Sequence, residues 1–171
     1  MKQSKRMLWL LLIAIIPLNG FTKYEKDYKF HTVFVYNFTK YIEWPVKTDQ
    51  MTIGIYNATD DVLESFKRMA DLKSTPTQKF VVKNVKSASE STECHILFIP
   101  EDQSSKFPDL MDKLSGKPIL VITEQPGLIR KGSLINFITT NGKLNIELNR
   151  SACEKAGLKV SGQLLGLAIL V

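Results

Sequence analysis

Two short apolar runs constrain the fold of this chain more than any other feature of its sequence. Residues 94–99 read CHILFI and residues 118–123 read PILVIT, so each run consists almost entirely of apolar side chains. Strands of a parallel sheet are covered by helices on both faces, and for that reason they read as near-continuous apolar runs. The two runs therefore predict buried strands at the centre of a parallel sheet.

Local patterns predict further strands and helices around these two runs. Residues 51–56 form a short apolar run, and residues 79–85 are rich in β-branched side chains, so both are predicted strands. Asp60 is expected to open a helix, because negative charge is favoured at a helix N-terminus. Residues 107–114 predict a short helix whose leucines face inward.

The C-terminal third predicts a hairpin followed by helices. Asn141-Gly142 separates two strand-like runs within residues 133–148, and Asn-Gly favours a tight turn because both turn residues must accept positive φ. Residues 151–171 have a helical pattern with a break near Gly157. The whole order predicts an α/β fold, with a mostly parallel central sheet flanked by helices, doubly wound in three layers, and a C-terminal β-hairpin and helices.

An amphipathic helix is predicted at residues 24–43, ahead of the first strand. Pro45 is expected to end it, because the residue before a proline is disfavoured in the α conformation. Its apolar residues recur at three- and four-residue spacing and are expected to share one buried face: Phe30, Val33, Phe34, Phe38, Tyr41 and Ile42.

Residues 1–20 have the order of a secretory signal peptide. Lys2, Lys5 and Arg6 precede an unbroken apolar run at residues 7–16, which is short for a membrane span of about 20 residues. An uncleaved anchor is the alternative. We expect export to the periplasm, with residues 21–171 forming a single domain.

The net charge argues against a nucleic-acid partner. The whole chain has 23 Lys and Arg against 17 Asp and Glu, a formal charge of +6. Without the three cations of the signal peptide, 20 remain against 17 acids, which leaves +3. That is a small excess, and basic residues are not interleaved with aromatic ones in a stripe.

Sequence motifs of common enzymes are absent, and no catalytic residue, metal ligand or cofactor is predicted. The chain lacks G-x-S-x-G, G-x-G-x-x-G, a Walker A loop and H-E-x-x-H. His31 and His95 are interpreted as structural. His95 is adjacent to Cys94, but neighbouring strand residues point to opposite faces. A disulfide between Cys94 and Cys153 is left open, because sequence does not show whether they approach each other.

The loops after the predicted strands are the candidate binding edge, because ligands of open α/β sheets bind outside the carboxyl ends of the strands. The side chains there offer recognition chemistry without a base–nucleophile pair, and a solvated edge without function is the alternative. The candidate residues of the edge are Tyr56, Asn57, Pro100, Glu101, Glu124, Gln125, Pro126 and Gly127. Trp44, just before Pro45, is either a core anchor or an interface residue, since tryptophan is enriched at binding hot spots.

Four blocks of this sequence together resemble the YfiR family. They are residues 36–45 (YNFTKYIEWP), residues 94–99, Pro126-Gly127 with residues 132–137 (GSLINF), and a C-terminal block of Asn149, residues 156–161 (AGLKVS) and Leu164-Leu165. The resemblance extends from about residue 27 to the end of the chain. It implies a periplasmic α/β protein that represses a membrane-bound diguanylate cyclase by binding its periplasmic sensor region. Release of such repression raises cyclic di-GMP and favours biofilm.

One departure from the family concerns its cysteines. Family members often carry a cysteine in the first strand that bridges the cysteine of the central strand, but residues 51–56 contain none. The resemblance therefore leaves redox control by a disulfide in doubt for this chain.

Three functions compete at this point. The first is a regulator that binds the periplasmic region of an inner-membrane signalling protein, a diguanylate cyclase or a sensor kinase. The second is a small-molecule receptor that uses the strand-end loops as its pocket, and the two can coexist. The third is a hydrolase without a recognisable motif. A homodimer is left open.

Overall fold

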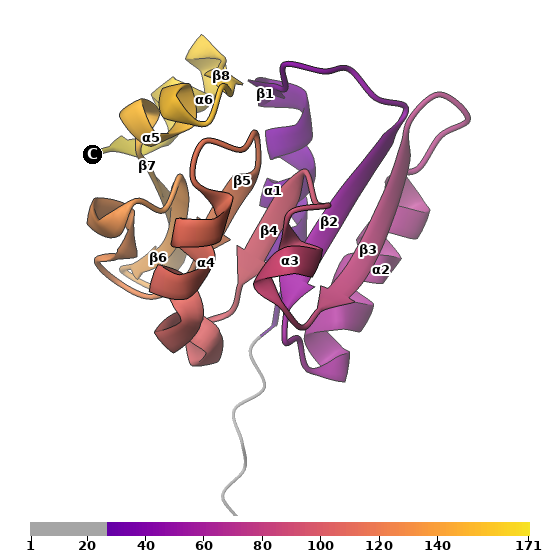
Figure 1. Ribbon diagram of the computed structural model, residues 1–171, viewed down its shortest axis with the longest axis horizontal. Helices are drawn as coiled ribbons and strands as arrows, with labels where there is room; N and C mark the ends of the chain where they lie inside the picture. Colours follow the sequence, from indigo (N-terminus) through magenta and orange to yellow (C-terminus); the bar gives the residue numbers. More distant parts are fainter. Residues whose placement is uncertain (1–26) are drawn as a thin grey trace, which may run out of the picture.

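A seven-stranded sheet forms the centre of the computed structural model, which describes residues 27–171 (Figure 1). The strand order is β3-β2-β4-β5-β6-β7-β9, and all neighbours are parallel except the β6–β7 pair. The strands are β2 (Gln50–Tyr56), β3 (Lys79–Val85), β4 (Ile96–Ile99), β5 (Leu120–Thr123), β6 (Ile135–Thr140), β7 (Lys143–Leu148) and β9 (Ile169–Leu170). The mostly parallel sheet confirms the predicted fold class. The predicted signal peptide lies outside the described residues.

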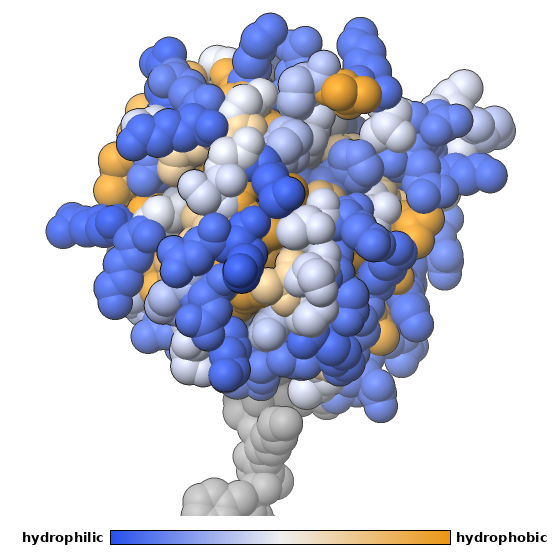
Figure 2. All heavy atoms as spheres, in the orientation of Figure 1, coloured by the Kyte–Doolittle hydropathy of each residue, from blue (hydrophilic) through white to orange (hydrophobic). Residues whose placement is uncertain are grey.

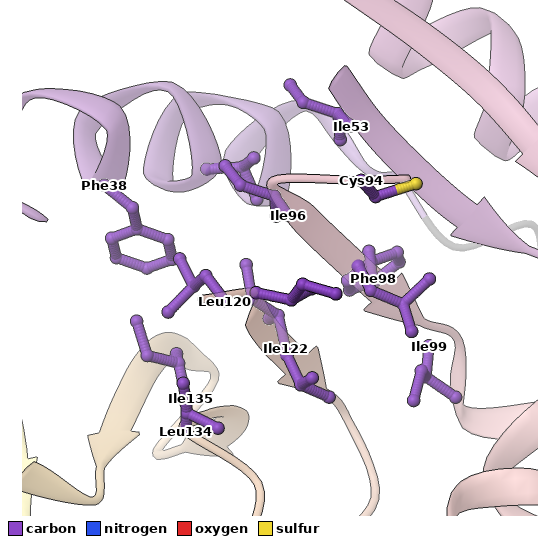
Figure 3. Close-up of a cluster of buried hydrophobic side chains, with 14 of the residues drawn as sticks. Phe38, Ile53, Cys94, Ile96, Phe98, Ile99, Leu120, Ile122, Leu134 and Ile135 are labelled. Carbon is purple, nitrogen blue, oxygen red and sulfur yellow. The ribbon is translucent and has the colours of Figure 1, made fainter. Parts of the chain in front are cut away.

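The two apolar runs form the buried centre of this sheet, as predicted. Every residue of β4 and β5 is buried, and the two strands pair in parallel with Phe98 opposite Ile122. Figure 3 shows these side chains meeting Phe38, which points from a helix toward the strands. The apolar character of the runs thus follows from their cover on both faces.

Helices lie on both faces of the sheet and complete three layers (Figure 1). On one face lie α1 (Lys29–Tyr41) and α2 (Asp60–Lys73), which contact each other. On the other lie α3 (Ala88–Ser91) and α4 (Phe107–Leu114), with the 3-10 helix η1 (Glu101–Lys106) leading into α4. The bounds of α4 agree with the predicted helix. No helix among residues 27–171 has both the length and the apolar character needed to cross a membrane.

The C-terminal third contains the predicted hairpin and more short elements than expected. Asn141 and Gly142 have φ of 52° and 72° in the turn between β6 and β7, as the sequence predicted. The 3-10 helix η2 (Leu128–Lys131) precedes the hairpin, and α5 (Arg150–Lys155) and α6 (Gly162–Leu167) follow it. Two very short strands, β1 (Ile42–Glu43) and β8 (Lys159–Val160), pair antiparallel in a separate sheet that the sequence did not predict.

The first helix differs from the prediction in its end and in its buried face. It ends at Tyr41, four residues before Pro45, because the chain then enters β1. Phe30 and Val33 were expected to be buried, but they are 68% and 55% exposed. The buried face instead passes through His31, Thr32, Val35 and Phe38.

Candidate functional site

The predicted site residues lie at two opposite edges of the sheet. Strands β2, β4 and β5 are parallel, so the loops that follow them lie at one edge, which is the lower edge in Figure 1. Trp44 lies away from that edge, beside the residues that precede β4. We call the edge with the loops that follow β2, β4 and β5 the carboxyl edge. One pocket there brings together Glu101, Glu124 and Pro126. The predicted set therefore does not form one site.

Glu124 is the centre of the carboxyl edge, and it is buried rather than solvated as a loop position suggested. It follows β5 directly and is 5% exposed. Its Oε2 accepts hydrogen bonds from the Tyr28 hydroxyl at 3.2 Å and from the Glu101 N–H at 3.2 Å. Its Oε1 lies 2.9 Å from His31 Nε2. The carboxylate thus connects the start of α1 with the loops after β4 and β5.

His31 and Tyr28 are the residues that sequence reasoning missed at this edge. His31 was interpreted only as a structural histidine, and its neighbour is a buried carboxylate far along the chain. It also contacts aromatic rings, with its centroid 4.7 Å from that of Phe137 and 4.9 Å from that of Tyr28. Burial raises the pKa of the Tyr28 phenol well above its ordinary value, and the Glu124 carboxylate raises it further. Tyr28 therefore remains a hydrogen-bond donor at neutral pH.

A cavity of about 250 Å³ opens beside this cluster. His31, Glu101 and Glu124 supply its charged and titratable groups. The rest of the lining is mostly apolar and comes from the loop after β5 and from the hairpin: Pro126, Phe137, Ile138, Thr139 and Leu144. Pockets with apolar walls and a few convergent polar groups are typical ligand sites, although this one is small.

The other predicted residues of the edge do not line this cavity. Tyr56 and Pro100 are buried and belong to the packing of the strand ends. Asn57 adopts φ of 45°, and its N–H donates to the Val85 carbonyl at 2.9 Å, which joins the ends of β2 and β3. Gln125 and Gly127 are exposed beside the cavity.

Trp44 occupies the core position that was one of its two predicted roles. Its side chain is buried, and its indole N–H donates to the His95 carbonyl at 3.3 Å. His95 was interpreted as structural. Its imidazole Nδ1 accepts the Thr52 backbone N–H at 3.1 Å, and its backbone N–H donates to the Thr52 carbonyl. Burial lowers the pKa of His95, so the neutral acceptor form is favoured.

The two cysteines are free thiols in separate parts of the core. Cys94 precedes β4 and Cys153 lies on α5, and both are buried. Burial raises the pKa of Cys94 to about 11 and that of Cys153 to about 12. Among residues 27–171, no three His, Cys, Asp or Glu side chains converge closely enough to hold a metal ion.

A second surface feature lies on the face formed by α1 and α2. Phe30 and Val33 of α1 are exposed, and Leu72 of α2 is 75% exposed. A groove of about 450 Å³ runs between the two helices, with Val33, Met69 and Leu72 among its apolar lining. Charged residues of both signs also line it, including Asp61, Glu64, Arg68 and Lys73. We call the residues that line this groove the α1–α2 groove.

The face that carries α3 and α4 is mainly hydrophilic, with small scattered apolar areas (Figure 2).

Solved structures share the fold of this chain at low sequence identity. A domain from Streptococcus pneumonia, described as the ABC domain in complex with L-Trp, is 14% identical with a TM-score of 0.54, and the match covers 71% of this chain and 55% of that one. A conserved domain protein from Vibrio cholerae is 10% identical with a TM-score of 0.55, covering 83% and 59%. This chain thus spans little more than half the length of either. No curated protein sequence matches it.

A family model assigns the chain to a protein family, whereas the solved structures show only a shared fold. The model described as YfiR/HmsC-like (DUF4154) matches residues 28–169, which is nearly all of the described chain. This family consists of periplasmic proteins with a regulatory role. The match agrees with the resemblance found in the four sequence blocks, and the chain belongs to the YfiR/HmsC-like family.

Proposed function

We propose that this protein represses a membrane-bound signalling enzyme, a diguanylate cyclase or a sensor kinase, by binding the periplasmic region of that enzyme. The observation that carries the proposal is membership of a periplasmic regulatory family across residues 28–169. Regulation by binding requires a surface for the partner rather than a catalytic array. The next step is to identify the surface of this chain that binds the partner.

The α1–α2 groove is the surface we assign to the partner. Its apolar centre, with Val33 and Leu72 exposed, is bordered by charged side chains of both signs. An apolar centre within a polar rim is the usual anatomy of a protein interface. A groove between two helices also suits an amphipathic helix, which inserts its apolar side chains and leaves its polar face to the rim.

Affinity capture from membranes tests this assignment with a matched control. The tagged protein is incubated with detergent-solubilised membranes of its own organism, and the captured proteins are quantified by mass spectrometry. We expect a membrane-bound cyclase or kinase to be enriched, and the double variant Val33→Asp/Leu72→Asp to lose it. The control is Val46→Asp/Leu167→Asp, because these two side chains are 74% and 70% exposed outside the groove.

Two results would overturn the proposal. One is the absence of any membrane signalling enzyme from the captured set. The other, which concerns the surface alone, is equal capture by the groove variant and the control variant. Melting curves of both variants establish that a loss of capture is not a loss of folding.

The cavity at the carboxyl edge favours a second candidate function, that of a small-molecule receptor. It places a buried carboxylate and a buried imidazole beside apolar walls. The two functions are compatible, since a ligand that binds one state of a regulator shifts its affinity for the partner.

A further inference from the structure

A pocket beside α4 is lined by cations and belongs neither to the carboxyl-edge cavity nor to the α1–α2 groove. Its volume is about 400 Å³, and its lining comes from α4, the loop after α4, η2 and α5. Four cationic side chains from three of these segments converge on it: Lys117, Arg130, Lys131 and Lys155. No Asp or Glu of the described chain lines it. We call it the basic pocket.

The four cations are not neutralised by the carboxylates around them. None of the four forms an ion pair with any residue that the structure describes. Glu154 is next to Lys155 in the sequence, but its carboxylate is held by Arg150 at 2.8 Å. The C-terminal end of a helix supplies only about half of a negative elementary charge, so the ends of η2 and α5 do not balance four cations. The basic pocket therefore keeps a net positive charge.

The base of the basic pocket is apolar. Leu114, Ile119 and Leu134 line it and are buried, and Met111 beside them is half-buried. Ligand pockets for small molecules have volumes of about 300–1,000 Å³, so this one has room for a ring and a charged group. Low-dielectric walls concentrate the field of charges of one sign, so an anion is attracted and a cation is repelled. A ligand that fits combines an anionic group with an apolar body.

We propose that the basic pocket binds a phosphate ester whose organic part is apolar. A phosphomonoester carries about 1.5–2 negative charges at neutral pH, so it engages several cations at once, whereas a carboxylate carries a single charge. The planar guanidinium of Arg130 can donate two parallel hydrogen bonds to phosphate oxygens, and the lysines act as point charges around them. The organic part packs on Met111 and Leu114.

This site goes beyond the proposed repression of a signalling enzyme. It shares no residue with the α1–α2 groove and lies beside α4, on the opposite face of the sheet from α1 and α2 (Figure 1). The same chemistry has two sources. One is a soluble phosphate ester, and the other is the headgroup of a phospholipid at the membrane surface. Both present a phosphate on an apolar body, and the experiment must separate them.

Calorimetric titration of the purified protein tests the charged group and the apolar body. The probes are phenyl phosphate, 3-phenylpropionate and 2-phenylethanol, which share a ring and differ in charge, together with inorganic phosphate, which lacks the ring. We expect phenyl phosphate to bind about tenfold tighter than 3-phenylpropionate and about a hundredfold tighter than 2-phenylethanol. Inorganic phosphate should bind about tenfold more weakly than phenyl phosphate, because it does not contact the apolar base.

Two pocket variants and a matched control assign the binding to these cations. Arg130→Gln/Lys131→Gln should weaken phenyl phosphate at least about tenfold, and Lys117→Gln/Lys155→Gln repeats the test with cations from two other segments. The control Lys47→Gln/Lys67→Gln removes the same charge from two exposed positions outside the pocket, so it should bind like the parent. All these side chains are exposed, and melting curves confirm that the variants fold.

Flotation with lipid vesicles separates the two sources. Binding to phosphatidylcholine vesicles that contain phosphatidic acid, but not to phosphatidylcholine alone, assigns the site to a lipid headgroup if the pocket variants lose it. Binding of phenyl phosphate without flotation assigns it to a soluble ester. The proposal is overturned if phenyl phosphate does not bind, binds no tighter than 2-phenylethanol, or binds both pocket variants as tightly as the parent. None of these results changes the membrane capture, so the two proposals fail separately.

Discussion

Replacing Glu124 with alanine should destabilise the protein far more than a loop substitution normally does. Glu124 Oε2 accepts the Tyr28 hydroxyl and the Glu101 N–H, both at 3.2 Å. Hydrogen bonds to a charged group contribute about 1.5–3 kcal/mol each, and these two are long, so the low end applies. We therefore expect Glu124→Ala to lower the free energy of unfolding by about 3 kcal/mol, a large part of the roughly 5–15 kcal/mol of a typical domain.

Urea unfolding followed by tryptophan fluorescence measures this loss. Trp44 is the reporter, because the other tryptophan, Trp9, lies in the predicted signal peptide. Gln125→Ala is the matched control, since this neighbouring side chain is exposed and should stay within about 0.5 kcal/mol of the parent. Glu124→Gln keeps an acceptor for both donors and should lose less than Glu124→Ala. A loss below about 1 kcal/mol for Glu124→Ala would refute the reasoning, because it would mean that the buried contacts contribute little net stability.

Three further predictions concern the core. Trp44→Ala should cost about 3–5 kcal/mol in urea unfolding followed by circular dichroism, and unchanged stability would contradict its buried position. Gly54→Ala places a Cβ 2.6 Å from Cys94 Sγ, so it should lower stability by about 1–3 kcal/mol, and adding Cys94→Ala should restore part of the loss. Burial raises the pKa of Cys94 to about 11 and that of Cys153 to about 12, above the values in the unfolded chain. Above about pH 8.5 the unfolded chain loses these protons while the folded protein keeps them, so the stability that the two thiols contribute is intact below that pH and is lost as pH rises toward 11. Stability measured from pH 8 to 11 should fall on the order of 1 kcal/mol per unit for each thiol, and a Cys94→Ala/Cys153→Ala variant that falls as steeply would exclude the thiols as the cause.

The elements that the sequence predicted correctly are those with a local signal. Residues 79–85 and 107–114 have the bounds that their side-chain patterns indicated, and the Asn141-Gly142 turn has the positive φ that its composition favours. The central strands were predictable because burial on both faces removes polar residues from them.

The buried face of α1 and the carboxyl-edge cluster were not predictable in this way. Periodicity shows which apolar residues share a helix face, but it does not say which face meets the sheet, and Phe30 and Val33 are exposed as a result. Glu124 was found as a strand-end residue, yet its partners are His31 in the first helix and Tyr28 just before that helix. Contacts between residues so far apart leave no local pattern. The one available signal was His31, a titratable residue on the apolar side of α1, which indicates a buried polar partner elsewhere in the chain.

Reconstitution with the captured signalling enzyme tests the central claim most directly. Membrane vesicles that contain the enzyme are prepared with its periplasmic region accessible, and its catalytic rate is measured while purified protein is added. The account predicts that the rate falls in a saturable manner with the parent protein and with Val46→Asp/Leu167→Asp, but stays high with Val33→Asp/Leu72→Asp. A rate that does not respond to the folded parent protein at any concentration would contradict the proposed repression.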